Sequence, residues 1–175
     1  MTATHAANEA GEAPSLAPLI DMIAADMARV NATIIDRMAS EVPLIPQLAG
    51  HLIASGGKRM RPMLTVASAM LGSDDAVARA PAIKLATAVE FIHSATLLHD
   101  DVIDESKLRR GQDTANALWG NDASVLVGDF LFARAFELMV EAGDITVLGR
   151  LATAATRITE GEIKQMAITG QPDTP

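Results

Sequence analysis

The chain has 175 residues, of which 49% are hydrophobic and only 3% aromatic, and it contains no cysteine. The length suits one ordinary domain with a hydrophobic core. The absence of cysteine excludes a disulfide scaffold, a zinc site with thiolate ligands and a cysteine nucleophile. The formal net charge of −8 argues against nucleic acid as a partner, because an acidic surface repels a phosphate backbone.

The sequence offers no sign of secretion or membrane insertion. The first lysine or arginine is Arg29, so no charged region typical of a signal peptide precedes it. No uncharged stretch reaches the ~18 apolar residues that cross a bilayer. The stretch that begins at Val42 is interrupted by Pro43, Pro46 and His51. We therefore expect a cytoplasmic protein without a membrane span.

In chain order, residues 1–13 are small, polar and aperiodic, and we expect a disordered tail there. The remainder, 14–175, is expected to belong to a single domain. Its apolar residues recur at steps of three and four, which predicts helices. The predicted helices cover the ranges 15–40, 43–54, 62–72, 77–105, 124–142 and 146–168.

Breakers and caps separate these periodic stretches. Ser73, Asp74 and Asp75 are expected to cap the helix that follows them. Arg109, Arg110 and Gly111 are predicted to form a turn, and no stretch shows the alternation typical of a strand. The predicted fold class is therefore all-α, a helical bundle.

The most informative segment is an acidic stripe near the end of one predicted helix. On a helix, Asp100 and Asp104 share one face, because a step of four residues returns to nearly the same angle. His93 and Thr96 precede them on that face, and Asp101 lies at its edge. If the stripe is partly buried, two carboxylates near 4 Å repel by about 4 kcal/mol at an effective dielectric near 20. A Mg²⁺ ion, which favours oxygen ligands, would relieve that repulsion.

A solvated acidic helix end is the alternative interpretation of the stripe. Like charges on an exposed helix repel by only ~0.2–0.5 kcal/mol, so their spacing alone does not require a metal. Metal binding and a solvated face therefore both remain open at this point.

Two basic blocks accompany the acidic stripe. The block GGKRMRP at 56–62 places three cations on a glycine turn that enters a helix, where free backbone N–H groups favour an anion. A second block, RRG at 109–111, follows the stripe. Surface charges for solubility would explain either block alone but explain the three features together poorly. A diphosphate–metal complex needs this pairing of carboxylates with guanidinium groups.

The segments GGKRMRP and FIHSATLLHDDVIDESKLRRG resemble the trans-prenyltransferases, which are polyprenyl diphosphate synthases of the class I isoprenoid fold. A DDxxD motif alone is a weak signal, but here it occupies 100–104 and an arginine pair follows at the family's distance. The resemblance covers roughly 15–170 and is strongest over 50–120. Class I terpene cyclases share DDxxD but usually lack this combination of basic blocks.

The resemblance implies a site for two diphosphates. Asp100 and Asp104 are implied to bind Mg²⁺ for the allylic diphosphate, with Asp101 an accessory on the same motif. Arg109 is implied to hold that diphosphate, which completes the implied catalytic set. The positions that match the family's isopentenyl diphosphate contacts are Lys58, Arg61, His93 and Arg110. His99 is expected to be structural, because the helix turns it about 100° from Asp100.

The implied chemistry is ionisation, condensation and elimination. The allylic diphosphate leaves, the double bond of isopentenyl diphosphate attacks the allylic cation, and a proton is then lost. In this family, bulky side chains four or five positions before the first aspartate of the motif close the product pocket. Here those positions are Thr96 and Ala95, both small. We therefore predict a long-chain product of the kind used for a quinone side chain, and a shorter product from Ala95→Phe.

The sequence departs from the family in one respect. Family members are roughly twice as long and carry a second aspartate-rich motif, whereas no second DDxxD follows Asp104 here. We expect apolar helix faces to stay unburied and the chain alone to have little or no synthase activity. The leading interpretation is the N-terminal half of a long-chain synthase, with a homodimer or a partner chain supplying the rest. The family's dimer helices correspond mostly to about 115–145.

Two other interpretations stay open. The chain is a non-catalytic or complementing subunit if it pairs with a partner that carries the second motif. The other interpretation is a different metal-dependent enzyme, such as a phosphohydrolase that binds its metal through a His-Asp pair. The adjacent His99 and Asp100 would then be the metal ligands. The remaining histidines offer no matching ligand order, and this interpretation leaves GGKRMRP unexplained.

Overall fold

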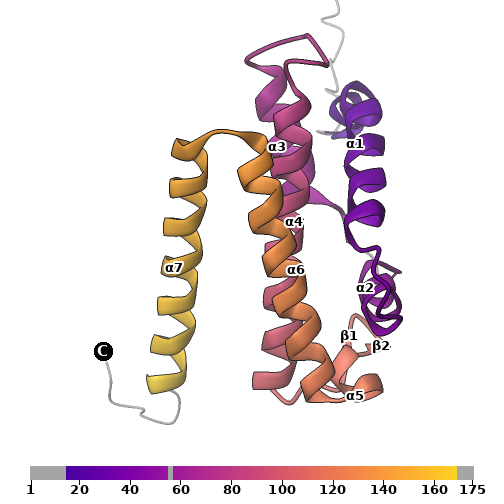
Figure 1. Cartoon of the computed structure of the whole chain (residues 1–175), viewed down its shortest axis with the longest axis vertical. Coiled ribbons are helices and arrows are strands. Elements are labelled where there is room, and N and C mark those ends of the chain that lie inside the picture. The colour runs from indigo at the N-terminus through magenta and orange to yellow at the C-terminus, as the bar shows by residue number, and fades with distance from the viewer. Residues whose placement is uncertain (1–14, 55–56, 169–175) are drawn as a thin grey trace, which may run out of the picture.

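The structure is a computed structural model that describes residues 15–54 and 57–168, which are mostly helical (Figure 1). The helices are α1 (Ala17–Arg37), α2 (Leu44–Ala54), α3 (Met60–Met70), α4 (Ala80–Ile103), α5 (Ala115–Trp119), α6 (Asn121–Ala142) and α7 (Ile145–Ile168). Two short strands pair antiparallel, β1 (Leu108–Arg109) and β2 (Gln112–Asp113). The predicted all-α class is confirmed. The predicted tail at 1–13 lies outside the described residues.

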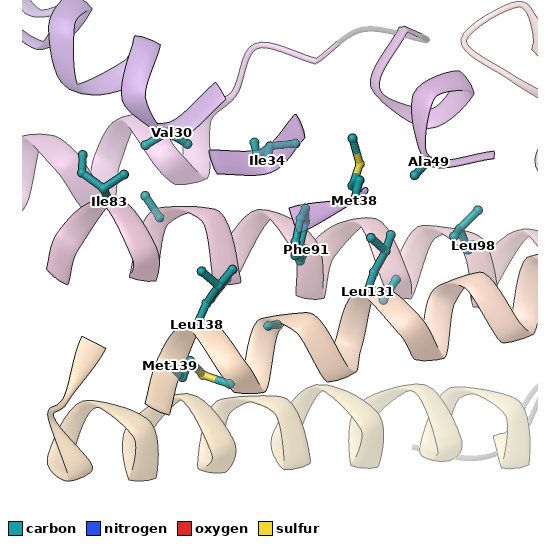
Figure 2. Close-up of a cluster of buried hydrophobic side chains, with 14 of the residues drawn as sticks. Val30, Ile34, Met38, Ala49, Ile83, Phe91, Leu98, Leu131, Leu138 and Met139 are labelled. Atoms are coloured by element: carbon teal, nitrogen blue, oxygen red, sulfur yellow. The ribbon is translucent and has the colours of Figure 1, made fainter. Parts of the chain in front are cut away.

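Helices α4 and α6 form the centre of the bundle and pack against each other along their lengths. Figures 1 and 2 show α1 on the α4 side of this pair and α7 beside α6 on the other side. The hairpin and α5 connect the end of α4 to the start of α6. This connection stays at one end of the bundle, so the two central helices run antiparallel, as expected for neighbours in a bundle.

The hydrophobic core lies between α1, α4 and α6 (Figure 2). Val30 of α1, Phe91 of α4 and Leu131 of α6 are each at most 2% exposed. Fully burying a side chain of this kind stabilises the fold by about 1.5–3 kcal/mol. The buried positions of α4 recur at steps of three and four, as a helix requires. They include Thr87, Phe91, Ala95 and Leu98.

Helices α4 and α6 approach closely where a glycine faces a histidine. A Cβ atom at Gly128 would clash with Nε2 of His99, so the imidazole occupies the space that a side chain would fill. The same Nε2 lies 3.2 Å from the carbonyl oxygen of Val125. One turn away, the Ser124 hydroxyl donates to the carbonyl oxygen of Leu98. His99 therefore contacts α6, in agreement with the structural role expected for it.

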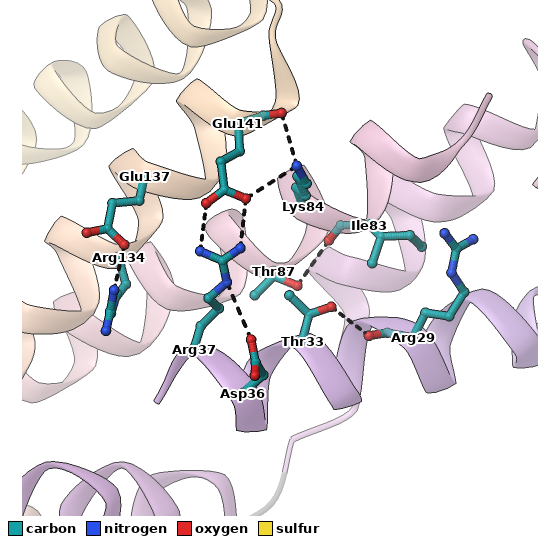
Figure 3. Close-up of polar contacts among 10 residues, drawn as sticks. All are labelled: Arg29, Thr33, Asp36, Arg37, Ile83, Lys84, Thr87, Arg134, Glu137 and Glu141. Atoms are coloured by element: carbon teal, nitrogen blue, oxygen red, sulfur yellow. Dashed lines mark hydrogen bonds and ion pairs between the residues drawn. The ribbon is translucent and has the colours of Figure 1, made fainter. Parts of the chain in front are cut away.

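Charged side chains tie α1 to the far ends of α4 and α6 (Figure 3). Arg37 donates from Nη1 and Nη2 to the two carboxylate oxygens of Glu141, both at 2.7 Å. Lys84 donates to the backbone carbonyl of Glu141 at 3.1 Å. The hydrogen bond from Arg37 lowers the pKa of Glu141. Because these groups are exposed, an ion pair of this kind contributes only ~0.2–1 kcal/mol to the free energy of unfolding.

The predicted capping of α4 is wrong. Ser73 and Asp75 accept hydrogen bonds from the backbone N–H groups of Asp75 and Val77, and α4 begins later, at Ala80. The segment is held instead by Arg79, whose side chain donates to the carbonyl of Ser73 and to the buried carboxylate of Asp26 on α1. The capping side chains therefore bond within a turn that precedes α4 and not at its first residues.

Three further differences concern the segment between the central helices. The predicted turn at 109–111 is the tip of a β-hairpin, so the expectation of no strands is corrected. The five-residue helix α5 was not predicted, since it is too short to show a hydrophobic period. Helix α6 begins at Asn121 rather than at 124, because it starts directly after Gly120, whose φ is +88°.

Helix α7 packs on one side only. No residue of α7 is buried, although Leu148 and Leu151 contact the core. Ile158 is 53% exposed and Ile163 61% exposed, as the expectation of unburied helix faces predicts. A groove of about 410 Å³ runs between α6 and α7. Of the helices within the described ranges, none is both long and apolar enough to cross a membrane.

The Gly128–His99 contact predicts the effect of one added methyl group. Gly128→Ala should destabilise the fold by about 1–3 kcal/mol, because the Cβ atom would displace the imidazole from a packed interface. Urea denaturation followed by circular dichroism measures the change. Gly50→Ala is the control: no atom lies within 4 Å of its Cβ position, and alanine in a helix is favoured by up to ~1 kcal/mol. Equal stability of the two variants would contradict the prediction.

Candidate functional site

The three aspartates of the acidic stripe have different environments at the end of α4. Asp101 is buried, with 2% of its surface exposed, whereas Asp100 is half-buried and Asp104 is exposed. Asp104 follows the last residue of α4 and is its C-cap. Two carboxylates, one helical turn apart, therefore stay accessible on one face, and the third points into the protein.

Asp101 is paired with Arg109 of strand β1. The guanidinium donates from Nε at 3.1 Å to both carboxylate oxygens and from Nη2 at 2.9 Å to Oδ1. Multiple bonds between one guanidinium and one carboxylate fix both the position and the plane of the arginine. Arg109 keeps 31% of its side chain exposed, so the pair orients it without covering it.

Arg109 and Arg110 are placed by the hairpin. Arg109 pairs with Gln112 in register, and the two-residue tip, Arg110 and Gly111, has φ values of +54° and +80°. Two consecutive positive φ values are typical of the type I′ turn, whose twist matches that of the strands. Nη1 of Arg110 lies 3.4 Å from the Cβ position of Gly57, so the hairpin tip meets the glycine turn before α3.

Buried polar groups attach the hairpin to the helices. The Asn116 side-chain amide donates to the carbonyl oxygens of Asp101 and Ser106, each at 3.1 Å. The Thr114 hydroxyl also donates to Ser106, at 2.8 Å. Nε2 of His51 on α2 lies 2.8 Å from the carbonyl oxygen of Asp113. The end of α4, the hairpin and α2 therefore form one hydrogen-bonded unit.

The predicted basic residues converge on one cavity of about 570 Å³ between α3, α4 and the hairpin. Its lining side chains include five cations and, within the described ranges, one carboxylate, that of Glu90. The predicted site residues that line it are Lys58, Arg61, His93, Arg109 and Arg110. Residues more than 50 positions apart in sequence are thus brought together, and the arrangement suits an anion with several oxygens.

Two charged lining residues, Arg59 and Glu90, were not predicted as site residues. Arg59 Nη1 donates to Glu90 Oε1 at 2.6 Å, and their side chains are 21% and 10% exposed. One signal was available: Glu90 precedes His93 by three residues and therefore shares its helix face. The signal was incomplete, because the bonding partner of Glu90 lies on another element, 31 residues earlier.

The site alters the proton affinity of two predicted residues. Burial raises the pKa of Asp100, and the nearby carboxylates of Glu162 and Asp104 raise it further. Burial lowers the pKa of His93, and the charge of Arg61 lowers it further. At neutral pH His93 is therefore uncharged and can act as a hydrogen-bond donor or acceptor. Asp100 carries a charge that a cation would stabilise.

The predicted product-length positions lie beside this face of α4. Ala95 is fully buried in the core cluster, and Thr96 is partly buried, with its hydroxyl donating to the carbonyl of His93 at 2.8 Å. Thr96 therefore presents part of its side chain outside the core, whereas a larger side chain at Ala95 would have to displace core atoms.

Within the described part of the chain, no three histidine, aspartate or glutamate side chains converge as a metal site. Asp101, the third carboxylate of the acidic stripe, is bonded to Arg109. The carboxylates of Asp100 and Asp104 fit a Mg²⁺ ion nonetheless. This ion typically takes one or two protein carboxylates and completes its octahedron with water and substrate phosphate oxygens.

The pKa of His93 provides a test of this geometry. An NMR titration of its ring protons should give a value below the ordinary 6.5. Arg61→Gln should raise the pKa only partway, because burial is the larger cause. Arg134→Gln, on the surface of α6, should leave it unchanged. Since the unfolded state binds this proton more readily, His93 also lowers folding stability as pH falls through about 6.5. A pKa at or above 6.5 would contradict the placement.

Comparisons with known proteins identify relatives of this chain. The octaprenyl diphosphate synthase of Escherichia coli K12 is 46% identical over 159 residues, which are 91% of this chain and 48% of that protein. Heptaprenyl diphosphate synthase component 2 of Geobacillus stearothermophilus is 36% identical over 86% of this chain and 46% of its own length. The chain thus spans about half the length of these relatives.

A solved structure agrees in fold as well as in sequence. A polyprenyl synthase of Caulobacter crescentus CB15, crystallised with calcium and isoprenyl diphosphate, is 56% identical with a TM-score of 0.82. The match covers 89% of this chain and 47% of that one. The family model for polyprenyl synthetase matches residues 42–175. The helical bundle is therefore the trans-prenyltransferase fold, and the chain belongs to the polyprenyl synthetase family.

Proposed function

We propose that the chain contributes the diphosphate- and metal-binding half of a prenyltransferase. That enzyme condenses an allylic diphosphate with isopentenyl diphosphate and extends a long-chain all-trans polyprenyl diphosphate. The observation that carries the proposal is the cavity lined by five cations beside two accessible carboxylates. A protein of net charge −8 that places five of its 14 lysine and arginine residues around one cavity has a local site for an anion.

Isopentenyl diphosphate is proposed to occupy the cavity. Lys58 and Arg61 approach from the start of α3, and Arg110 approaches from the hairpin tip. Guanidinium groups bind phosphate oxygens through paired, charge-assisted hydrogen bonds, and a lysine ammonium adds a point charge. His93 is neutral at neutral pH and would bond one oxygen without adding a charge.

The allylic diphosphate is proposed to bind at Asp100, Asp104 and Arg109, with Asp100 and Asp104 as the protein ligands of Mg²⁺. When bound, the ion supplies Lewis-acid stabilisation of the departing diphosphate. Arg109 adds a fixed positive charge there, because Asp101 holds its guanidinium in place. Such preorganised charge stabilises a leaving anion without reorganisation at the moment of reaction. Asp101 thus acts through Arg109 as a positioning residue.

The whole enzyme needs more than this chain. We propose that an isolated chain has little or no activity and that the exposed apolar face of α7 packs against the remaining half in the assembled synthase. We further propose a homodimeric enzyme in the cytoplasm whose product is a precursor of a quinone side chain. The octaprenyl diphosphate synthase of Escherichia coli supports the long chain.

The alternative is a complementing subunit that binds a partner chain carrying the second aspartate-rich motif. The relative from Geobacillus stearothermophilus favours this alternative, because its name, component 2, implies that another component exists. Copurification with a separate chain that carries a DDxxD motif would support the subunit over the half-enzyme.

Calorimetric titration of the purified chain with pyrophosphate, with and without Mg²⁺, tests the proposed function. Binding should be tighter with Mg²⁺, and Asp104→Asn should weaken the Mg²⁺-dependent binding roughly 10- to 100-fold, the value of one charge-assisted contact. Asp21→Asn, an equal change of charge at the start of α1, should have no effect. With both substrates and Mg²⁺, the isolated chain should give no turnover. Pyrophosphate binding that ignores Mg²⁺ would contradict the metal site, and turnover would contradict the proposed inactivity.

Product length is tested in an assembled enzyme that contains this chain. Thr96→Phe should shorten the product, because position 96 is partly outside the core, whereas Thr96→Val should leave it unchanged. Ala95→Phe should also shorten it, but at a cost of about 1–3 kcal/mol in stability, because Ala95 is fully buried. Product chain length is read by mass spectrometry and stability by thermal melting. Unchanged product length in both phenylalanine variants would contradict the prediction.

A further inference from the structure

The turn before α3 has an unusual backbone conformation. Arg59, the residue that precedes α3, has φ +48° and ψ +36°, in the left-handed region that favours glycine. A residue with a Cβ atom adopts this region only where its surroundings hold it there. Its carbonyl oxygen accepts the N–H of Met63, so the conformation of Arg59 sets where α3 begins. Lys58 and Arg61 lie on either side of it and both line the cavity.

A side-chain contact holds this conformation. The Arg59 guanidinium reaches α4 and donates to Glu90, and both groups are largely buried. A buried carboxylate and guanidinium that bond each other are costly to separate, because the remaining charge would be desolvated without a partner. The ion pair therefore attaches the cationic turn to the helix that carries His93 and Asp100.

Glu90 lies in an unfavourable place for an anion site. It is a carboxylate in the lining of a cavity whose other charged lining groups are cations, and its negative charge repels any anion bound there. By charge alone, its removal should tighten anion binding. The geometry points the other way, because Glu90 is the group that positions the turn.

We propose that Arg59 and Glu90 are a positioning pair that orients Lys58 and Arg61 toward the diphosphate. The inference rests on the proposed function of the cavity as a diphosphate site. Neither residue of the pair needs to bind the anion. Glu90 increases anion affinity by holding the left-handed turn in place, and this gain exceeds the repulsion from its charge.

Pyrophosphate binding by the full chain, measured by calorimetry, tests the sign of this effect. Glu90→Gln should weaken binding roughly tenfold, although it removes a negative charge from the cavity. Glu137→Gln is the matched control, because Glu137 also pairs with an arginine, Arg134, but on the exposed face of α6. It should leave affinity unchanged or slightly tighter. Arg59→Lys keeps the charge but loses the guanidinium geometry, and it should also weaken binding.

Hydrogen exchange separates positioning from a loss of folding. In Glu90→Gln, the backbone amides of 57–61 should exchange faster while those of the α6 core keep their protection. Tighter or unchanged pyrophosphate binding by Glu90→Gln would overturn the positioning role of the pair. Arg59, released from Glu90, would then bind the anion directly or add its positive charge to the cavity. Failure of the unmodified chain to bind pyrophosphate would instead overturn the proposed function, and with it this inference.

Discussion

The ion pair between Asp101 and Arg109 is the interaction on which the site depends. Three carboxylates within five residues repel one another, and burying one of them unpaired would cost several kcal/mol. Arg109 removes this difficulty by bonding Asp101 through two nitrogens. In return, the buried carboxylate fixes the hairpin against the end of α4. Two aspartates remain accessible, and one arginine is held in a defined orientation beside them.

Ion pairs between separate elements also hold the cations that line the cavity in place. Its cations come from the turn before α3 and from the hairpin, and each group is anchored to α4 by one carboxylate. Asp101 anchors the hairpin through Arg109, and Glu90 anchors the turn through Arg59. Helix α4 therefore acts as the common frame for both proposed diphosphate positions. Its other face packs in the core against α1 and α6, so this frame cannot shift without disturbing the core.

The helices of this chain are buried to different extents, which fits a chain that spans about half the length of its relatives. Helices α1, α4 and α6 share a core, whereas α7 contacts its neighbours along one side and leaves isoleucines exposed. The chain spans about half the length of its relatives, so the proposed enzyme gains its remaining cavity wall from other residues. The binding of diphosphate and the completion of the active site are then properties of different halves.

Periodicity, breakers and motif spacing were sufficient to predict the helical class and the main helices. The resemblance to the family added four of the five cations that line the cavity, together with His93. Steps of three and four residues report directly on one helix face, and for that reason the acidic stripe was visible in the sequence. The hairpin and α5 were missed, because segments of two to five residues carry no period. The start of α4 was predicted too early, because Ser73 and Asp75 bond within a turn that precedes the helix.

Only the tertiary structure decided which charges pair with which. The sequence placed Asp100, Asp101 and Asp104 in one motif, but the fold assigned Asp101 to Arg109 and left the other two accessible. It also joined Arg59 to Glu90 across 31 positions. Side-chain identity and local spacing determine which groups are available along each helix. Their partners depend on how the helices pack, because a charge loses its water only when another element covers it, and only then must it find a partner.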